Sequence, residues 1–368
     1  MRILYDHQAF SLQNLGGITV YYYELASRLS LMPGVRVDVA LGFNRCHYPF
    51  PKRARQNLNV FGWKTKMAVG FKRYAINEAV TGAWCLTQKK WDIYHSTLYR
   101  KMPTVAARRT VATNHDCTQD RFPELFKNPQ RITNAKRELY ARADAIFCVS
   151  EFSRKDLLKY YDVEPEKTHV IHQGFPRLER LPDQAGIFIE KIRRPYILFV
   201  GPRYAYKNFN GLLEAFGSGK LSRNYDLTVL GGEPFNEAEQ KEINRLGLSS
   251  CVMHLRSVTD PILAEAYARA ALFVSPSLYE GFGLPPLEAL SLGCPVLASS
   301  TASIPEICGD AVLYFDPFAP GDLQRKIEDA LNATDHAERL AKASERIQRY
   351  SWQTNAEKTF KVYEGLVR

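Results

Sequence analysis

Three observations predict an α/β fold with two doubly wound domains. Short β-rich runs alternate with helical patterns along the chain, which is typical of βαβ units with parallel strands. The alternation occurs in two sets, and residues 176–194, which include Pro176 and Pro182, interrupt regular structure between them. The length of 368 residues exceeds one ordinary domain and suffices for two. We therefore expect an N-terminal domain at 1–180 and a C-terminal domain at 190–350.

Both halves show the same succession of strands and helices, and a last helix near 352–368 is expected to pack back on the first domain. Doubly wound folds bind ligands at the carboxyl ends of their strands, so the cleft between two such domains is the expected site. In the first half the expected strands are 2–6, 35–42, 92–95, 109–114, 145–149 and 168–172, and the expected helices are 18–31, 67–88, 131–142 and 152–161. In the second half the expected strands are 196–200, 226–230, 252–255, 271–275, 295–298 and 311–314, and the expected helices are 207–216, 236–246, 260–269, 285–292, 319–332 and 335–349.

The composition indicates a cytoplasmic protein. Hydrophobic residues make up 45%, enough for each domain to bury a core. No apolar run approaches the roughly 18–20 residues of a membrane span, and the first six residues lack the apolar region of a signal peptide. Seven scattered cysteines without a C-x-x-C pair argue against a disulfide framework or a zinc site. Peripheral attachment to the inner face of the membrane remains compatible with this composition.

The net charge of +10 belongs to the first half. Residues 1–180 carry 29 Lys and Arg against 16 Asp and Glu, whereas the remainder carries 20 against 23. Cationic side chains interleaved with aromatic ones suit an anionic membrane surface, and a solvated basic loop is equally compatible with the pattern. Nucleic acid is not expected, because no known nucleic-acid-binding motif accompanies the charge. The basic segment, 45–73, has no acidic residue and contains Arg45, Lys52, Arg53, Arg55, Lys64, Lys66, Lys72 and Arg73.

Gly16 and Gly17 follow the first expected strand and begin the helix expected at 18–31. Glycines at this place let the backbone approach a ligand, and the helix N-terminus favours an anion. A tight turn explains the two glycines equally well.

Arg203 and Lys207 lie in the loop after strand 196–200. Both are within reach of the carboxyl edge of that strand, where Arg offers a planar fork for phosphate and Lys a point charge. A helix N-terminus beside them would help to hold a diphosphate. Two exposed basic residues on a loop are the simpler reading, but the position favours phosphate binding.

A third constellation spans 275–288. Gly281 and Gly283 leave backbone N–H groups open to a ligand, and the two prolines that follow suit the first turn of a helix. Glu280 is expected in the loop and Glu288 about one turn into the helix, on the same side. One carboxylate can then accept hydrogen bonds from sugar hydroxyls and the other from ribose. A helix cap with a solvated glutamate would not explain the clustered glycines.

These residues resemble the retaining GT-B glycosyltransferases of family 4, of the bacterial surface-polysaccharide type. Glu280 and Glu288, separated by seven residues, look like the paired-glutamate motif of that family. The resemblance covers nearly the whole chain and is weakest at 44–90. Further similar segments are Tyr5–Gln8 with the glycine pair, Asn114-His115-Asp116, Val149–Ser153, Arg203 with Lys207, and Ile304–Ile307 with Gly309–Ala311.

The resemblance implies a GT-B fold with two Rossmann-like domains that face each other across a cleft. It implies that Arg203 and Lys207 neutralise the donor diphosphate, that Glu280 positions the donor sugar, and that Glu288 binds ribose. The implied catalytic residues are His115, Glu280, Arg203 and Lys207. The implied donor-binding residues are Gly16, Gly17, Arg203, Lys207, Arg256, Val258, Glu280, Gly281, Phe282, Gly283, Leu284 and Glu288.

The chain contains no Asp-x-Asp, the usual carboxylate pair for a divalent metal in such enzymes. We therefore expect a metal-independent reaction in which basic side chains and helix dipoles meet the charge of the leaving group. The expected donor is UDP-glucose-type or GDP-mannose-type, with no further cofactor. The expected acceptor is a glycan or a lipid-linked sugar, and the resemblance implies attack on the face from which the diphosphate departs.

Two other functions are compatible with parts of the sequence. A sugar-nucleotide epimerase would share the GT-B fold but would need no acceptor. A non-enzymatic protein could bind lipid or polyanion through the basic segment, although the set of Arg203, Lys207, Glu280 and Glu288 argues against it. A dinucleotide oxidoreductase is disfavoured because no G-x-G-x-x-G follows a strand.

Overall fold

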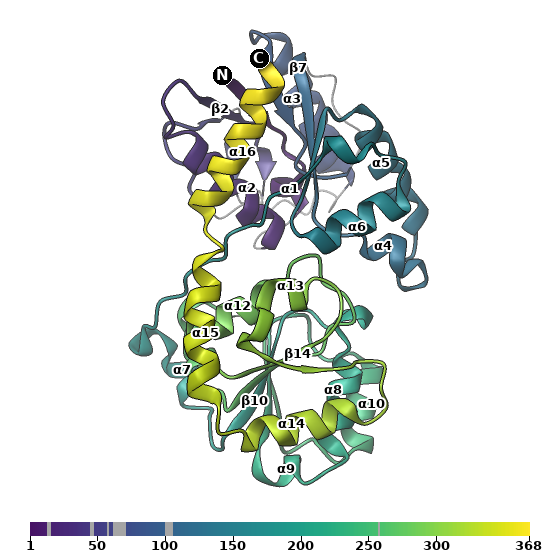
Figure 1. The fold of residues 1–368 in the computed structure, drawn as a ribbon, viewed down its shortest axis with the longest axis vertical. Helices are drawn as coiled ribbons and strands as arrows, with labels where there is room; N and C mark the ends of the chain where they lie inside the picture. The colour runs from purple at the N-terminus through teal and green to yellow at the C-terminus, as the bar shows by residue number, and fades with distance from the viewer. Residues whose placement is uncertain (13–15, 45–47, 57–58, 62–70, 100–105, 257) are drawn as a thin grey trace. The chain divides into compact units, whose positions relative to one another are not determined.

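The chain folds into two compact units, each described here by itself. Unit 1 comprises Met1–Gly174 together with Tyr350–Arg368, and unit 2 comprises Phe175–Arg349. The structure, a computed structural model, describes residues 1–12, 16–44, 48–56, 59–61, 71–99, 106–256 and 258–368 (Figure 1).

Unit 1 is built on a seven-stranded parallel sheet of order β4-β2-β1-β6-β7-β8-β9. Successive residues of a strand face opposite sides of the sheet. In β1, accordingly, Ile3 and Tyr5 belong to one core cluster and Leu4 to another. The strands are β1 Arg2–Tyr5, β2 Arg36–Val39, β4 Arg55–Gln56, β6 Trp91–His95, β7 Ala107–Asn114, β8 Ala145–Cys148 and β9 Thr168–Val170.

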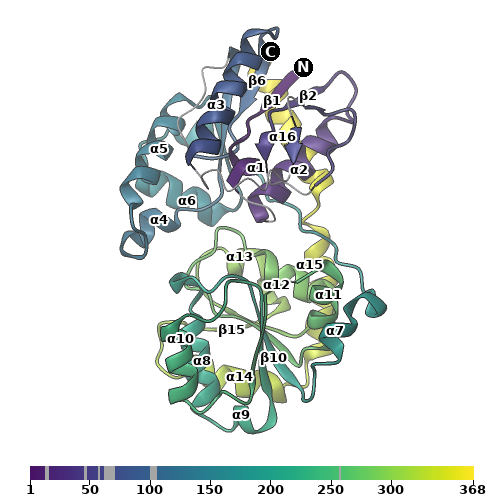
Figure 2. The ribbon, with the colours of Figure 1, turned by 180° about the vertical axis from the view of Figure 1, so that it is seen from behind.

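Helix α16, Trp352–Val367, belongs to unit 1 although it ends the chain, and it lies beside α2, Gly17–Leu29 (Figures 1 and 2). Gly174 makes this return possible, because a Cβ there would lie 2.4 Å from the backbone nitrogen of Trp352. The other helices of unit 1 are α1 Gln8–Leu12, α3 Phe71–Leu86, α4 Thr118–Arg121, α5 Pro129–Arg142 and α6 Glu151–Tyr160.

Unit 2 is built on a six-stranded parallel sheet of order β12-β11-β10-β13-β14-β15. Helices cover both of its faces: α8 packs with α10 and α14, whereas α12 packs with α11 and α15 (Figure 2). The strands are β10 Tyr196–Val200, β11 Asp226–Leu230, β12 Val252–Leu255, β13 Leu272–Ser275, β14 Val296–Ser299 and β15 Leu313–Phe315. The helices are α7 Gly186–Ile189, α8 Phe209–Gly217, α9 Leu221–Asn224, α10 Glu237–Arg245, α11 Asp260–Arg269, α12 Leu284–Ser291, α13 Ile304–Cys308, α14 Asp322–Asn332 and α15 His336–Gln348.

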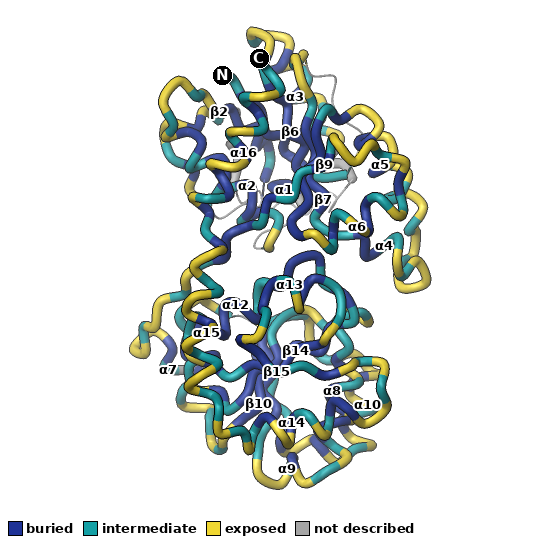
Figure 3. Tube along the Cα trace, viewed as in Figure 1, coloured by how far each residue is buried: buried dark blue, intermediate teal, exposed yellow. Residues whose placement is uncertain are grey.

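In each sheet, successive strands are added first toward one edge and then toward the other, and this order reverses between two neighbouring strands. In unit 2 this point lies between β10 and β13, and in unit 1 between β1 and β6. The loops after such neighbouring strands diverge to opposite faces and leave a crevice at the carboxyl edge, where ligands of doubly wound folds bind. The strands themselves are buried, so the polar groups of the site come from these loops (Figure 3).

The predicted α/β class and most predicted elements are confirmed, with ends that differ by a few residues. One prediction is wrong: the strand expected at 35–42 ends at Val39, and the chain continues into a separate two-stranded sheet of β3 Gly42–Asn44 and β5 Asn59–Phe61. The divergence begins at Gly42, whose φ of 57° only glycine adopts readily. The side chain of Asn77 then bonds both the N–H and the C=O of Phe43.

Among the helices of the described residues, none is both long enough and apolar enough to cross a membrane.

Candidate active site

Three loops meet at the carboxyl edge of the unit 2 sheet, after β10, β13 and β14. The backbone N–H of Leu278 donates to the carbonyl of Tyr206 at 2.8 Å, which joins the first two loops. The third loop contributes Thr301, whose hydroxyl donates to the carbonyl of Leu278 at 3.1 Å. It also contributes Ser303, whose hydroxyl contacts the carbonyls of Glu280 and Phe282 at 2.8 and 2.9 Å. Residues from three separate strands are thereby held in one place.

Lys207 and Glu280 form the central contact of this edge. The Lys207 Nζ lies 2.5 Å from Glu280 Oε1, and the Ser277 hydroxyl donates to the same oxygen at 2.8 Å. Both charged side chains are less than one-fifth exposed, so their attraction is screened less than that of a surface pair. Glu280 Oε2 has no partner among the described residues. This oxygen can accept a ligand hydroxyl, and the ammonium has two further donors for an anion.

The segment after Glu280 presents backbone donors to the same edge. Gly283 adopts a φ of 98° and precedes α12, which has no side-chain cap. Within the described part of the chain, the N–H groups of Gly283 and Leu284 have no partner, although Gly283 is buried. Buried backbone N–H groups are rarely left unpaired, and the N-terminus of a helix attracts anions. These two groups are therefore suited to an acidic or hydroxyl-bearing ligand.

Glu288 is the fifth residue of α12 and is buried. Its Oε2 accepts a hydrogen bond from the Tyr267 hydroxyl at 3.1 Å. Burial raises the pKa of Glu288 to about 7, the nearby charge of Asp260 acts in the same direction, and the Tyr267 hydroxyl opposes them. Burial therefore favours the protonated carboxyl, and a ligand that donates hydrogen bonds would favour the ionised form.

Arg203 and Lys207, expected to act together, have different partners in the structure. The Arg203 side chain is only 4% exposed and forms a bidentate ion pair with Glu239, with Nε 2.8 Å from Oε1 and Nη2 3.3 Å from Oε2. The guanidinium also donates to the carbonyls of Gly231 and Glu233 and lies 4.7 Å from the ring centroid of Phe235. Each guanidinium nitrogen thus already has a protein partner. Arg203 joins the loops after β10 and β11, whereas Lys207 joins the loops after β10 and β13.

Two glycines explain why the guanidinium can enter this position. Gly231 and Gly232 have φ values of 84° and 75°, and a Cβ on Gly232 would lie 3.0 Å from Arg203 Nη1. Glu239 is presented by the start of α10, where it forms a capping box with Asn236. A planar guanidinium matches such a carboxylate with two parallel hydrogen bonds.

Arg256 and Val258 follow β12 at the same edge of the sheet. Arg256 is exposed and pairs with the exposed Glu233 at 2.9 Å, whereas Val258 is partly buried. Ser257 lies outside the described residues. Exposed pairs of this kind contribute about 0–1 kcal/mol, so Arg256 can exchange its partner for a ligand at little cost.

In unit 1, His115 follows β7 at the carboxyl edge. Its backbone N–H donates to the Tyr99 hydroxyl at 2.8 Å, and its ring Nε2 has no partner in the part of the chain that the structure describes. Burial lowers the pKa of His115 to about 4, with Asp116 opposing and Lys136 adding to the effect. The imidazole is therefore neutral at physiological pH and can donate at one nitrogen and accept at the other.

Gly16 and Gly17 begin helix α2, as expected from the sequence. Gly16 is the N-cap, in extended conformation and without a side-chain cap, and the first turn carries no acidic residue. Tyr21 and Tyr22 of the same helix contact the His115 ring edge-on, with centroids 5.1 and 5.8 Å apart. Helix α2 thus joins the glycine pair to the histidine within unit 1.

Sequence reasoning missed several residues that shape the site. Tyr267 bonds Glu288, Ser277 bonds Glu280, Ser303 bonds two carbonyls of the glycine segment, and Glu239 engages Arg203. Of these residues, only Ser277 could have been identified from the sequence, because it lies three residues before Glu280 in the same loop. The other contacts join segments that are distant in sequence.

Known family models match both units. The family model described as Glycosyltransferase Family 4 matches residues 15–177, and the model described as Glycosyl transferases group 1 matches residues 186–347. The chain belongs to glycosyltransferase family 4. The fold of family 4 is GT-B. This chain is a glycosyltransferase enzyme. The two alternative functions, a sugar-nucleotide epimerase and a non-enzymatic binding protein, are not supported.

Similar proteins place the transferase among enzymes that move sugars. The O-antigen chain mannosyltransferase B of Escherichia coli is 29% identical over 300 residues, which cover 77% of each chain. The MMP alpha-(1->4)-mannosyltransferase of Mycolicibacterium hassiacum is 29% identical over 273 residues, 70% of this chain and 65% of that protein. The sucrose-phosphate synthase of Thermosynechococcus elongatus superposes with a TM-score of 0.76 at 18% identity and covers 100% of this chain and 99% of its own. At that identity the likeness concerns the fold alone.

Replacement of Arg203 by Met should destabilise the transferase by about 3–5 kcal/mol, because it leaves the Glu239 carboxylate buried without its partner. Adding Glu239→Gln should recover part of the loss. Arg256→Met is the matched control, since it breaks an exposed pair, and it should cost no more than about 1 kcal/mol. Denaturant unfolding measures all three variants. Equal effects of Arg203→Met and Arg256→Met would contradict the structural role of Arg203.

The raised pKa of Glu288 should make the stability of the transferase depend on pH. A carboxyl that binds its proton more tightly when folded stabilises the fold at low pH, and the contribution is lost as pH rises from the ordinary value of 4.5 to about 7. The total loss is at most about 3 kcal/mol. Since Gln does not titrate, the stability of Glu288→Gln relative to wild type should increase from pH 5 to pH 8. Glu190→Gln, at an exposed position, is the control; a constant difference for Glu288→Gln would contradict the assignment.

Proposed function

We propose that the enzyme transfers mannose from a GDP-mannose-type donor to a glycan or lipid-linked sugar acceptor in surface polysaccharide synthesis. The contact between Lys207 and Glu280 at the carboxyl edge of unit 2 carries the proposal, because it sets a cation for phosphate beside a carboxylate for sugar hydroxyls. The names of both relatives described above, mannosyltransferases, support mannose as the hexose. A UDP-glucose-type donor is the alternative that the first experiment distinguishes.

In the proposed complex, Lys207 and the N-terminus of α12 meet the charge of the donor diphosphate. Glu280 Oε2, which lacks a partner among the described residues, accepts a hydroxyl of the donor sugar. Glu288, held by Tyr267, accepts the ribose hydroxyls. Arg256 and Val258 border the base. Arg203 acts as a positioning residue through Glu239 and the loops that it joins.

The proposed reaction is retaining and metal-independent. The bond between the anomeric carbon and the diphosphate oxygen breaks with its electron pair on the phosphate. The acceptor hydroxyl oxygen forms the new bond on the same face, and its proton passes to the departing phosphate oxygen. Positive charge beside the departing oxygen stabilises the transition state more than the ground state. Lys207 supplies that charge, and the absence of Asp-x-Asp in the sequence supports a reaction without metal. His115, as a neutral imidazole, contacts the transferred sugar or the acceptor hydroxyl.

Lys207→Ala and Glu280→Ala should each lower transfer by roughly 100-fold or more, since each removes a group that acts in the transition state. Both variants should remain folded, because the hydrogen bond from the Leu278 N–H to the Tyr206 carbonyl still joins the two loops. Lys241→Ala, an exposed lysine of α10, is the matched control. Transfer is measured with radiolabelled GDP-mannose and UDP-glucose, with and without a chelator. Near wild-type turnover in either variant would contradict the site, and loss of turnover with chelator would contradict metal independence.

The donor base is tested by thermal shift with GDP, UDP and their sugars, because a ligand that binds the folded state raises its stability in proportion to the logarithm of its concentration over Kd. A shift with GDP but not UDP would support the proposal. A shift with UDP alone would replace mannose by a UDP-linked hexose. The absence of any shift would contradict the proposed donor site.

We further propose that the basic segment brings the enzyme to anionic membranes, where a lipid-linked acceptor is found. Lys52, Arg53 and Arg55 are exposed, and Arg55 lies 5.8 Å from the ring centroid of Trp84. Amphipathic aromatic rings beside cations suit a lipid headgroup region. Arg45, Lys64 and Lys66 lie outside the described residues, and the side chains of Lys72 and Arg73 are likewise not described.

Replacing the five residues Lys52, Arg53, Arg55, Lys64 and Lys66 by Gln should abolish co-sedimentation with phosphatidylserine vesicles, because each lost cation weakens binding by about 1 kcal/mol. The control replaces five exposed cations of unit 1 outside the segment. An unchanged bound fraction in the first variant, or an equal loss in both variants, would contradict the proposal. The control residues are Lys89, Lys90, Lys127, Arg131 and Arg137.

A further inference from the structure

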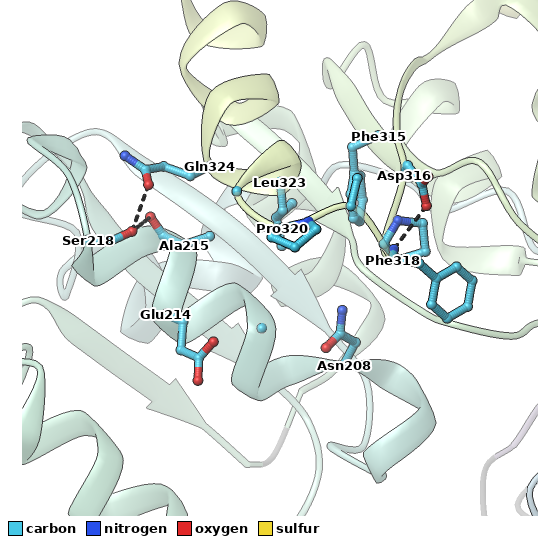
Figure 4. A pocket seen from close by; sticks show the side chains of 14 residues that line it. Asn208, Glu214, Ala215, Ser218, Phe315, Asp316, Phe318, Pro320, Leu323 and Gln324 are labelled. Atoms are coloured by element: carbon cyan, nitrogen blue, oxygen red, sulfur yellow. Dashed lines mark hydrogen bonds between the residues drawn. The ribbon is translucent and has the colours of Figure 1, made fainter.

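Unit 2 contains a pocket of about 510 Å³ between the start of α8 and the loop that joins β15 to α14 (Figure 4). Pockets that enclose small ligands have volumes of roughly 300–1,000 Å³. None of the residues assigned above to the donor lines it, although Asn208 follows Lys207 directly in the chain. Its polar and aromatic lining comes from Asn208, Glu214, Ser218, Asp316, Phe318 and Gln324.

The chemistry of the lining excludes anionic ligands and favours neutral polar ones. The lining contains no Lys or Arg, but it contains the carboxylates of Glu214 and Asp316. A phosphate or a nucleotide would be repelled by these charges. Carboxylate, amide and hydroxyl groups together accept and donate hydrogen bonds, which is what a ligand with many hydroxyls requires.

Phe318 adds an apolar surface to this lining. It is 64% exposed, which makes it one of the few large hydrophobic side chains that the described residues present to solvent. The loop that carries it is held in place: Asp316 accepts from the Phe318 N–H at 2.9 Å, and Asp322 accepts from the Asp316 N–H at 2.8 Å. A ring presented by a fixed loop binds with little loss of conformational entropy, and the aliphatic C–H face of a sugar ring can stack on it.

The opposite wall offers an amide in an unusual local arrangement. Asn208 adopts left-handed backbone angles, with a φ of 54° and a ψ of 37°, and occupies the N-cap of α8 without capping it. A Cβ on Gly211 would lie 2.5 Å from the Asn208 Oδ1, so the amide occupies space that only glycine leaves open. A glycine inside a helix costs about 1 kcal/mol relative to alanine. The left-handed backbone of Asn208 and the glycine at position 211 are both locally unfavourable, and together they permit this orientation of the Asn208 side chain.

The amide of Asn208 has no hydrogen-bond partner among the described residues, and Figure 4 shows it among the side chains that line the pocket. At the exposed side of the pocket, the Ser218 hydroxyl donates to Gln324 Oε1 at 2.8 Å and so joins α8 to α14. The pocket is therefore preorganised on both sides, with an unused donor and acceptor on one wall and an aromatic ring on the other.

We propose that this pocket binds a neutral saccharide, with one sugar ring stacked on Phe318 and its hydroxyls bonded to Asn208 and to the two carboxylates. Binding itself does not depend on the proposed transfer reaction. That the saccharide is part of the growing glycan rests on the proposed function. A pocket of this kind would keep the glycan on unit 2 between successive transfers.

Isothermal titration of the full chain with α-linked mannotriose and with maltotriose tests the proposal. Phe318→Ala should weaken the binding of the preferred trisaccharide roughly tenfold or more, because the ring loses its apolar contact. Asn208→Gly, which permits the same left-handed backbone but removes the amide, should weaken it roughly fivefold. Leu86→Ala removes an exposed apolar side chain, 89% exposed, from unit 1 and should leave the affinity unchanged.

Three outcomes would overturn the proposal: no binding of either trisaccharide, unchanged affinity in both pocket variants, or stabilisation by a divalent cation alone. Repeating the titration with Lys207→Ala separates the pocket from the active site. Affinity lost in Lys207→Ala but kept in Phe318→Ala would place the saccharide at the active site instead. Saccharide binding that persists in an enzyme with no transfer from either donor would refute the proposed function and leave the pocket assignment intact.

Discussion

The arrangement of the site depends on the contact between Lys207 and Glu280. A parallel sheet brings the ends of its strands to one edge, but it does not decide how the loops beyond those ends meet. The ion pair joins the loop after β10 to the loop after β13, on the two sides of the point where the strand order reverses. The pair is partly buried and Ser277 bonds the same carboxylate oxygen, so the carboxylate is held in one orientation and its other oxygen has no partner among the described residues.

The contrast between Arg203 and Lys207 shows how two cations four residues apart acquire different roles. Arg203 is nearly buried, and Glu239 and two carbonyls together accept hydrogen bonds from all three of its guanidinium nitrogens. Lys207 has a single contact to a carboxylate and keeps donors for a ligand. A buried charge must be fully paired, because leaving it unpaired costs several kcal/mol, whereas a partly exposed ammonium can exchange partners. Arg203 therefore joins the loops after β10 and β11, whereas Lys207 keeps donors that no described residue uses.

Sequence reasoning predicted what depends on local pattern and failed where distant segments meet. Strands such as β10 and β11 were predicted to the residue, because an apolar run between turn residues specifies a buried strand. The spacing of Glu280 and Glu288 was likewise readable, since it places one before and one within α12. The bond from Tyr267 to Glu288 and the capture of Arg203 by Glu239 could not be read, because each joins residues at least 21 positions apart. The short pair β3 and β5 was missed for the same reason, since it depends on the distant Asn77.

The carboxyl edge of unit 2 separates two kinds of ligand by charge. Lys207 and the N-terminus of α12 attract anions on one part of this edge, whereas Glu214 and Asp316 repel them from the pocket beside the start of α8. Lys207 and Asn208 are consecutive, so the change from one environment to the other occurs at the left-handed turn that precedes α8. A nucleotide sugar carries sugar hydroxyls and a diphosphate, and the negative charge of the diphosphate is repelled by the carboxylates of the pocket. A neutral glycan lacks that charge, and the two ligands can therefore be held by the same unit without competing for one site.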